Sequence, residues 1–251
     1  MSQPPATALF ADATRLLALD CAGDTLTLAL TQGEAVVAAR EAPGGAQSSN
    51  ALLPLAQAML AAQGWVWADL AGVAFGQGPG AFTGLRTACA VAQGLALGLD
   101  RPVLPLDSLC LVAEDAAAQA AGALQACTVV VDARMGEVYH AHYARTQDGW
   151  QALRPPGLDR PDALDLRGAH DWAGNGLALL PHPPAGRCWP QTAARAHALG
   201  RLAIAAARAG LWLDAADALP LYVRDKVALT TAEREAEREA ERSAELSKAQ
   251  A

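Results

Sequence analysis

The chain has 251 residues, of which 52% are apolar and 18% charged, so it has ample material for a buried core in one large domain or two small ones. Its net charge of −7 argues against a wide surface for phosphates, because non-specific affinity for nucleic acid comes from clustered Lys and Arg. No apolar run reaches the roughly 18 residues of a membrane span, and residues 1–15 lack the pattern of a signal peptide. We therefore expect a cytoplasmic globular protein without a membrane anchor.

The first half of the chain alternates short strands and helices. Three segments rich in Leu, Val and Thr are separated by glycine turns and predict a three-stranded meander: residues 16–21, 25–31 and 35–40. The periodicity of the next four segments predicts helix, strand, helix and strand in turn: residues 52–60, 71–76, 84–97 and 102–105. The predicted order is βββαβαβ.

A second round of the same plan begins after an Ala-rich helix that starts near Ser108. Strands are predicted at residues 127–132 and 136–143. Asp20 closes the first strand and Gly23 follows in its turn, while Asp132 and Gly136 occupy the same places in the later pair. This local similarity is what duplicated halves require.

The remainder of the second half is less regular. The Pro-rich stretches at residues 154–161 and 181–190 are predicted to be loops, and apolar spacing around Leu199 and Leu202 predicts an amphipathic helix that closes the second lobe. From Ala232 a repeated A-E-R-E pattern predicts a solvated, charged extension. The expected division is a first lobe at 15–106, a second at 107–227 and a tail at 228–251.

Neither cysteines nor histidines form a recognisable metal pattern. The five cysteines are widely separated and lack Cys-x-x-Cys spacing, which favours small buried residues in a reducing cytosol. His140 and His142 share one strand face, for which a polar face is a commoner explanation than a metal site.

The segment from Gly76 to Arg86, G-Q-G-P-G-A-F-T-G-L-R, joins a predicted strand to a helix. Glycines permit close backbone approach, and a helix N-terminus can receive an anion, so a phosphate cradle is physically feasible. However, the spacing is not that of a P-loop, and the segment contains no Lys. From the residues alone a structural turn and a phosphate site both stay open. The turn Ala173-Gly174-Asn175-Gly176 resembles one that cups adenosine, and a tight turn with a left-handed Asn explains it equally well.

Three segments together resemble the TsaB family, formerly grouped with glycoprotease-like proteins. They are G-P-G-A-F-T-G-L-R at 78–86, V-D-A-R-M-G-E-V-Y at 131–139 and P-L-Y-V-R-D at 220–225, and the resemblance covers the chain from about Leu16 to Val227. The resemblance implies an actin-like or Hsp70-like ATPase fold of class α/β, with two lobes of βββαβα type. The order predicted from the residues agrees with this.

The resemblance also implies a role. TsaB proteins support the transfer of threonylcarbamoyl to adenosine in tRNAs that decode codons beginning with A, as non-catalytic assembly subunits. The implied partners are the transferase TsaD, in a heterodimer, and a TsaE-type ATPase recruited to the pair; a homodimer is an alternative, and tRNA is contacted only indirectly.

The catalytic paralogue TsaD holds a metal with two histidines spaced H-x-x-x-H, and the resemblance places those positions at Ser108 and Val112. A hydroxyl and an isopropyl group cannot replace two imidazoles, so we expect no metal and no independent catalysis. An ATP-dependent small-molecule kinase of the same fold is the alternative; it needs a catalytic base that we cannot assign. A metalloprotease would need metal ligands that the sequence lacks.

Nucleotide binding is expected to be vestigial. Asp20 and Asp132 lie where this fold places carboxylates near phosphates and magnesium. Arg134 and Met135 add bulk to the second turn, so we expect that no cofactor is required, although weak ATP or ADP binding stays open. Ion-pair or capping roles explain both aspartates equally well. The candidate cofactor-binding residues are Asp20, Gly78, Gly80, Asp132 and Gly136.

The partner surface is expected on the two helices of the first lobe, because apolar residues cover more of the first helix than one packing side requires. The candidate interface residues are Leu52, Leu53, Leu55, Met59, Phe82, Leu85, Arg86 and Cys89. Two helices from each partner would form a four-helix seam, and a glutamate in place of Leu53 or Met59 is expected to break association without unfolding the chain. In the alternative, both helices pack wholly on their own sheet.

Overall fold

The computed structural model describes residues 10–166 and 171–224. Contacts between residues divide the chain into a unit of residues 1–221 and a short unit of residues 222–251, and every helix and strand of the described part lies in the first. The expected tail at 228–251 lies outside the described residues.

The first sheet has five strands in the order β3-β2-β1-β4-β5. They are β1 (Arg15–Asp20), β2 (Thr25–Gln32), β3 (Ala35–Pro43), β4 (Gly72–Gly78) and β5 (Val103–Asp107). The first three strands form the predicted antiparallel meander, and β4 and β5 continue the sheet parallel to β1. The parallel strands are connected through helices, as such connections require.

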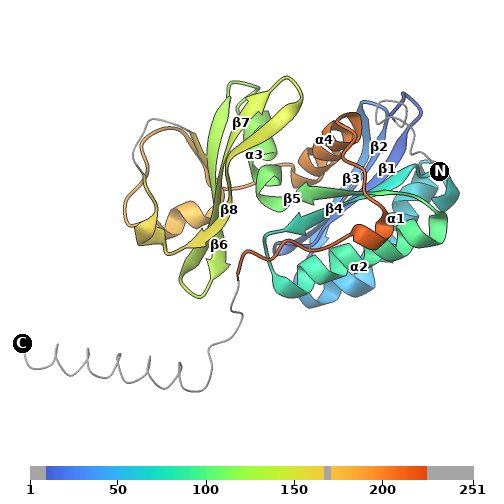
Figure 1. Ribbon diagram of the computed structural model, residues 1–251, viewed down its shortest axis with the longest axis horizontal. Helices are drawn as coiled ribbons and strands as arrows, with labels where there is room; N and C mark the ends of the chain where they lie inside the picture. Colours follow the sequence, from blue (N-terminus) through green and yellow to red (C-terminus); the bar gives the residue numbers. More distant parts are fainter. Residues whose placement is uncertain (1–9, 167–170, 225–251) are drawn as a thin grey trace, which may run out of the picture. The chain divides into compact units, whose positions relative to one another are not determined.

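Two helices cover one face of this sheet, α1 (Ser48–Ala62) and α2 (Phe82–Leu99) (Figure 1). Alternate residues of a strand point to opposite faces, so Leu17 and Leu19 of β1 join the core beneath these helices, whereas Leu16 and Ala18 face the other way. Both faces of β1 are therefore buried.

The late helix α4 (Arg195–Arg208) covers that opposite face. It was expected to close the second lobe, and this expectation is wrong. Leu199 and Ala203 pack with Leu16, Ala18 and Leu104 of the first sheet, and Figure 1 shows α4 beside that sheet. The reason is the apolar second face of the first sheet, which needs a cover that neither α1 nor α2 can provide.

The second sheet repeats the plan of the first in the order β10-β9-β6-β7-β8. Its strands are β6 (Ala126–Arg134), β7 (Glu137–Thr146), β8 (Gly149–Asp159), β9 (Asp171–Ala173) and β10 (Cys188–Trp189). β6, β7 and β8 form an antiparallel meander, and β9 and β10 run parallel to β6. The two halves thus share one mixed topology, which confirms the predicted two-lobed fold of actin-like type.

The second lobe departs from the predicted loops. Residues 154–159 belong to β8 despite Pro155 and Pro156, because an edge strand has an outer side on which no ladder hydrogen bond is needed. The stretch 181–190 is a loop apart from the two residues of β10. Short 3₁₀ turns, η4 (Pro161–Ala163) and η5 (Asn175–Leu179), follow β8 and β9, and helix α3 (Ser108–Gln119) packs against β6 and β7.

The remaining described elements are the 3₁₀ turns η2 (Gly45–Gln47), η3 (Trp67–Asp69) and η6 (Ala215–Asp217). After α4 the chain passes the edge of the first sheet, where Leu213 pairs with Val103, and η6 then lies against α2. None of the helices in the described part is long and apolar enough to cross a membrane.

The position of α4 leads to a stability prediction. Leu199 is 1% exposed and Leu211 is 56% exposed. We expect Leu199→Ala to lower the free energy of unfolding by about 2–5 kcal/mol, because it leaves a cavity against the first sheet. Leu211→Ala should change it by less than about 0.5 kcal/mol. Urea denaturation measures both, and equal losses would contradict this packing.

Candidate functional site

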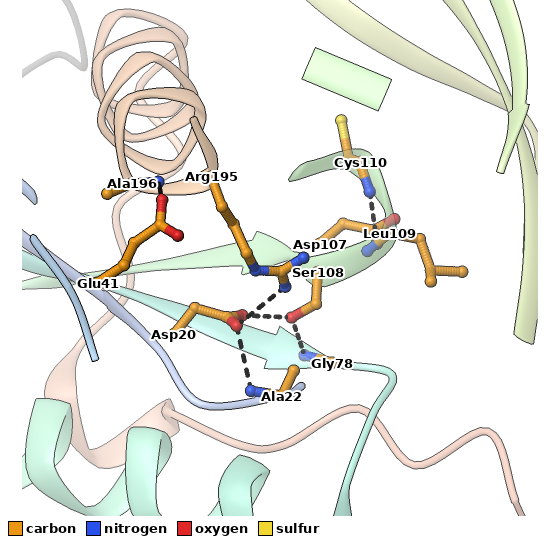
Figure 2. A network of polar contacts seen from close by, with 10 residues as sticks. All are labelled: Asp20, Ala22, Glu41, Gly78, Asp107, Ser108, Leu109, Cys110, Arg195 and Ala196. Carbon is orange, nitrogen blue, oxygen red and sulfur yellow. Dashed lines mark hydrogen bonds and ion pairs between the residues drawn. The ribbon is translucent and has the colours of Figure 1, made fainter. Parts of the chain in front are cut away.

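Asp20, at the end of β1, forms the centre of a buried polar network (Figure 2). Its Oδ2 accepts a hydrogen bond of 2.8 Å from the Ser108 hydroxyl, whose oxygen accepts from the Gly78 N–H at 3.2 Å. Its Oδ1 accepts from the Ala22 N–H at 3.1 Å and from Arg195 of α4 at 3.2 Å. Asp20 is 0% exposed, so Arg195 supplies the opposite charge that a buried carboxylate requires.

The Gly-rich segment packs directly on this network. A Cβ on Gly76 would lie 1.8 Å from Asp20 Oδ2, and one on Gly84 would lie 1.8 Å from the Cys21 carbonyl oxygen. At Gly80 the nearest atom would be the Ala22 carbonyl oxygen at 2.4 Å. These glycines are therefore required by close approach to the end of β1, which favours the structural turn over the phosphate cradle for this segment.

Asp107 caps the next helix beside this network. Its Oδ1 accepts from the N–H groups of Leu109 and Cys110 at the start of α3, and its Oδ2 accepts from the Tyr143 hydroxyl at 2.6 Å (Figure 2 shows the first two contacts). Burial raises the pKa of Asp107 above its usual value. Tyr143 belongs to β7, so this hydrogen bond joins the two lobes.

The second candidate aspartate, Asp132, is also engaged. Its Oδ1 accepts from the Arg134 N–H at 2.7 Å, and its Oδ2 lies 3.2 Å from the Arg134 guanidinium. The same guanidinium contacts Asp24, in the turn between β1 and β2, at 2.8 Å. Arg134 thus bridges the turns of the two lobes, and ion-pair roles account for both Asp20 and Asp132. Gly136, with φ +74°, lies in the turn between β6 and β7.

The turn at 173–176 has a packing explanation. Gly174, with φ +109°, is its left-handed residue, so the expected left-handed Asn is wrong. Asn175 instead accepts a hydrogen bond of 3.0 Å from the Asp132 N–H. A Cβ on Gly174 would lie 2.2 Å from the Val130 carbonyl oxygen, so the turn lies tightly against β6.

Ser108 and Val112, which correspond to the paralogue's metal ligands, contribute to internal structure instead. Ser108 belongs to the Asp20 network, and Val112 is a buried residue of α3. Within the described ranges, no three His, Cys, Asp or Glu side chains are grouped so that they could hold a metal. His140 is buried, contrary to the polar face expected for it, and pairs with Asp159 at 2.8 Å. His142 contacts the Thr128 hydroxyl at 2.8 Å.

Four cysteines are buried, and only Cys188 is exposed among the five. Burial raises the pKa of both Cys21 and Cys127 to about 12, so these thiols stay protonated at neutral pH. This agrees with their interpretation as small buried residues.

Burial divides the candidate interface residues into two groups. Leu52, Met59 and Cys89 belong to the core beneath α1 and α2, and Leu85 is also buried. The outward surface includes Leu53 and Phe82, which are 42% and 38% exposed, and exposed Arg86, whereas half-buried Leu55 packs against the core. Arg86 stacks on Phe82 at 3.7 Å from the ring centre. Met59→Glu would therefore disturb the core, and Leu53 is the better test position.

Two glycines of α2 lie on its outward side, and no close contact within the described chain requires a glycine at either position. Gly94 and Gly98 are exposed, and a Cβ built on either would meet no atom within 4 Å. A glycine in a helix interior costs roughly 0.5–1 kcal/mol relative to alanine. With exposed Ala90 they form a row of small residues at intervals of four, which a second helix could approach closely.

Sequence reasoning did not identify Arg195, Glu114 or Arg201. Glu114 of α3 is 5% exposed and accepts hydrogen bonds from Arg145, Arg201 and the Trp150 indole, which lie on β7, α4 and β8. These partners are distant in sequence, and single charged residues on a helix carry no local signal. Their pairing becomes visible only in the folded chain, where oppositely charged side chains from different elements meet.

Comparisons with known proteins agree on one relationship. The family model described as TsaD: tRNA N6-adenosine threonylcarbamoyltransferase matches residues 43–169. The tRNA threonylcarbamoyladenosine biosynthesis protein TsaB of Escherichia coli is 34% identical over 154 residues, which are 61% of this chain and 65% of that protein. TsaB of Haemophilus influenzae is 45% identical over 97 residues, 38% of this chain and 39% of that protein.

These alignments thus span at most 65% of the two curated relatives. The solved structure described as YeaZ from Pseudomonas aeruginosa extends the similarity. It has a TM-score of 0.76 and 30% sequence identity, and the match covers 83% of this chain and 99% of that one.

The buried pair of Asp20 and Arg195 can be tested by a double-mutant cycle. Arg195→Met leaves the Asp20 carboxylate buried without its partner charge, so we expect a loss of about 3–5 kcal/mol in the free energy of unfolding. Adding Asp20→Asn removes that charge, and the double variant should be about 1–3 kcal/mol more stable than the sum of the single effects predicts. Additive losses in urea denaturation would show that the two charges are not coupled.

Proposed function

Because the chain belongs to the TsaB/YeaZ family, we propose that it is a non-catalytic subunit in the threonylcarbamoylation of adenosine in tRNA. Two observations carry the proposal: the chain is similar to TsaB proteins, and its candidate aspartates, Asp20 and Asp132, are engaged in ion pairs of the protein itself. In this role it binds a TsaD-type threonylcarbamoyltransferase. The modified tRNAs decode codons beginning with A.

The contacts and chemistry of Asp20, Ser108 and Val112 support the non-catalytic assignment. Asp20 is fully buried and bonded to Arg195 and Ser108, so it is not presented to a substrate as a base. Ser108 and Val112 offer no metal-binding imidazole. The kinase alternative would need a carboxylate aimed at an acceptor, and both Asp20 and Asp132 are paired with arginines of the protein itself.

The partner is proposed to bind the outward surface of α1 and α2. Leu53 and Phe82 offer apolar side chains there, and Gly94 and Gly98 allow a partner helix to approach closely. The occupant is a TsaD homologue, with a second copy of this chain as the alternative.

A TsaE-type ATPase joins the pair, and tRNA is held by the partners because this chain has a net charge of −7. No cofactor is required, and any affinity for ATP or ADP is weak.

The cellular role can be measured directly. Depletion of this protein should lower the threonylcarbamoyladenosine content of tRNA, because the transferase would lack its assembly subunit. Mass spectrometry of tRNA nucleosides after depletion reports that content, and re-expression of the chain should restore it. An unchanged content in a cell without a second TsaB protein would refute the proposed function.

The partner surface can be tested with Leu53→Glu. A carboxylate buried at the seam would lose its hydration without a partner charge, so association with the TsaD homologue should weaken at least about tenfold. Leu153→Glu is the matched control, because Leu153 is 59% exposed on β8 and outside this surface. Size-exclusion chromatography measures association, and circular dichroism confirms folding.

Gly94→Leu supplies an independent test of the same surface. It should raise helix stability, since leucine favours a helix more than glycine does. It should nevertheless block close approach and weaken association. If both Leu53→Glu and Gly94→Leu co-elute with the partner as the unchanged chain does, the helices are not the interface.

A further inference from the structure

A cavity of about 770 Å³ lies between helix α4 and the hairpin that joins β7 to β8, so its walls come from both lobes. Its volume is within the range of about 300–1,000 Å³ that small-molecule sites occupy. Thr146 pairs with Gly149 across the hairpin, and its hydroxyl donates to the Gly149 carbonyl oxygen at 3.1 Å. A Cβ on Gly149 would lie 3.7 Å from the Cβ of Ala205, so the hairpin lies directly against α4. The protein's own contacts therefore hold both walls in place.

Three arginines of the described chain line this cavity, and each gives one nitrogen to a carboxylate. Arg145 and Arg201 share Glu114, which is buried, and Arg208 pairs with Glu34. One carboxylate thus serves two guanidinium groups, and positive charge is in excess beside it. The side chains of Arg145 and Arg201 are 40% and 37% exposed, so both are accessible to a small molecule.

Glu114 has no further capacity for these arginines. Its Oε2 accepts from Arg145 and from the Trp150 indole, and its Oε1 accepts from the Nε of Arg201. The Nη2 of Arg201 is buried and has no acceptor within the described ranges. A buried donor without an acceptor costs free energy unless another group supplies one. A guanidinium presents its N–H groups in a planar fork that matches a carboxylate or a phosphate.

The acids at the rim distinguish between these two anions. Glu34 and Asp148 also line the cavity, and both are exposed. The Arg208–Glu34 pair at 3.3 Å leaves no net charge at that end of α4. Among the described lining residues, three arginines are balanced by three acids. A ligand with several negative charges would be repelled by the rim, so a single carboxylate is favoured over a phosphate.

The other lining side chains favour an apolar body on the ligand. Phe10 and Leu202 line the cavity and pack against the core between α4 and the first sheet. Ile204 also lines it and is 5% exposed. The Arg145 guanidinium lies 5.2 Å from the centre of the Trp150 ring, so an aromatic face stands beside the positive charge. Apolar walls with a few placed charges are typical of small-molecule sites.

We propose that this cavity binds a small organic acid, whose single carboxylate pairs with Arg145 and Arg201 and whose apolar body lies against Phe10 and Leu202. A bound acid contacts both lobes and holds them together.

The site is separate from the other two surfaces. Helix α4 covers the face of the first sheet that is opposite to α1 and α2. The Asp20 network meets α4 at Arg195, and Arg201 lies six residues further along the helix, which corresponds to about 9 Å. The inference thus goes beyond the proposed function and does not depend on it.

The probes are three aromatic monocarboxylates of different length: benzoate, phenylacetate and indole-3-acetate. Calorimetry with the purified chain should show at least one of them binding with a Kd in the millimolar range or tighter. For phenylacetate, the uncharged 2-phenylethanol should bind at least about tenfold more weakly, because it lacks the charge-assisted hydrogen bonds. Phenyl phosphate should also bind more weakly than phenylacetate. The bound acid should raise the melting temperature, since it binds only the folded chain.

Two variants and a control locate the site. Arg201→Lys keeps a positive charge beside Glu114 but lacks the planar fork, so it should weaken binding at least about tenfold. Ala209→Phe places a large side chain at an exposed position of the cavity wall, and it should weaken binding while all the charges stay in place. Arg160→Lys is the matched control, because Arg160 is 75% exposed and outside the cavity, and its binding should be unchanged.

The opposite results overturn the inference. They are that none of the three acids binds, that Arg201→Lys and Ala209→Phe both bind as the unchanged chain does, or that Arg160→Lys reproduces their loss. Phenyl phosphate binding as tightly as phenylacetate would overturn the preference for a single carboxylate. If Arg201→Lys lowers the melting temperature of the ligand-free chain, Ala209→Phe alone decides. No TsaD homologue takes part in these measurements, so their failure leaves the proposed function unaffected.

Discussion

The buried ion pair between Asp20 and Arg195 is the interaction on which the arrangement of the chain depends. Asp20 ends the first strand, and Arg195 begins the last helix, so the pair joins the two ends of the described fold. Both side chains are shielded from water, and neither charge could stay buried alone. Helix α4 therefore has to lie against the first sheet with its N-terminus directed at the end of β1.

Further carboxylates hold the same helix end. Asp115 of α3 accepts from the N–H groups of Ala193 and Ala194, and Glu41 of β3 accepts from the Ala196 N–H. Negative charge is favourable at a helix N-terminus, where backbone N–H groups lack partners. The acids come from elements that are far apart in sequence. Together with Asp20 they make the start of α4 a meeting point of the first sheet and α3.

The two lobes are joined through a second buried acid, Glu114 of α3. Its carboxylate binds Arg145 and Trp150 from the second sheet and Arg201 from α4. The Tyr143–Asp107 hydrogen bond and the Arg134–Asp24 ion pair are two further polar contacts between the lobes.

Periodicity predicted the elements of this fold but not their tertiary partners. Alternation and helical spacing placed the three-strand meander, α1, α2 and the repeat that begins at β6, because these signals are local. The same spacing located α4, yet it could not say which sheet the helix covers. Pro155 and Pro156 concealed β8 because the sequence does not show that a strand is at an edge. On α1, spacing could not separate buried Met59 from exposed Leu53, since an Ala-rich helix has weak contrast between its faces.

The path of the chain after α4 determines which part of α2 stays open to a partner. Gln93 donates to the Ala215 carbonyl oxygen, the Cys89 thiol donates to that of Ala218, and η6 thereby covers one flank of the helix. The sheet covers a second flank, and α1 lies alongside. What is left is the side that carries Arg86 and the two open glycines, Gly94 and Gly98. Glycine disfavours a helix interior, and these two leave the side open, which is where the proposed partner surface lies.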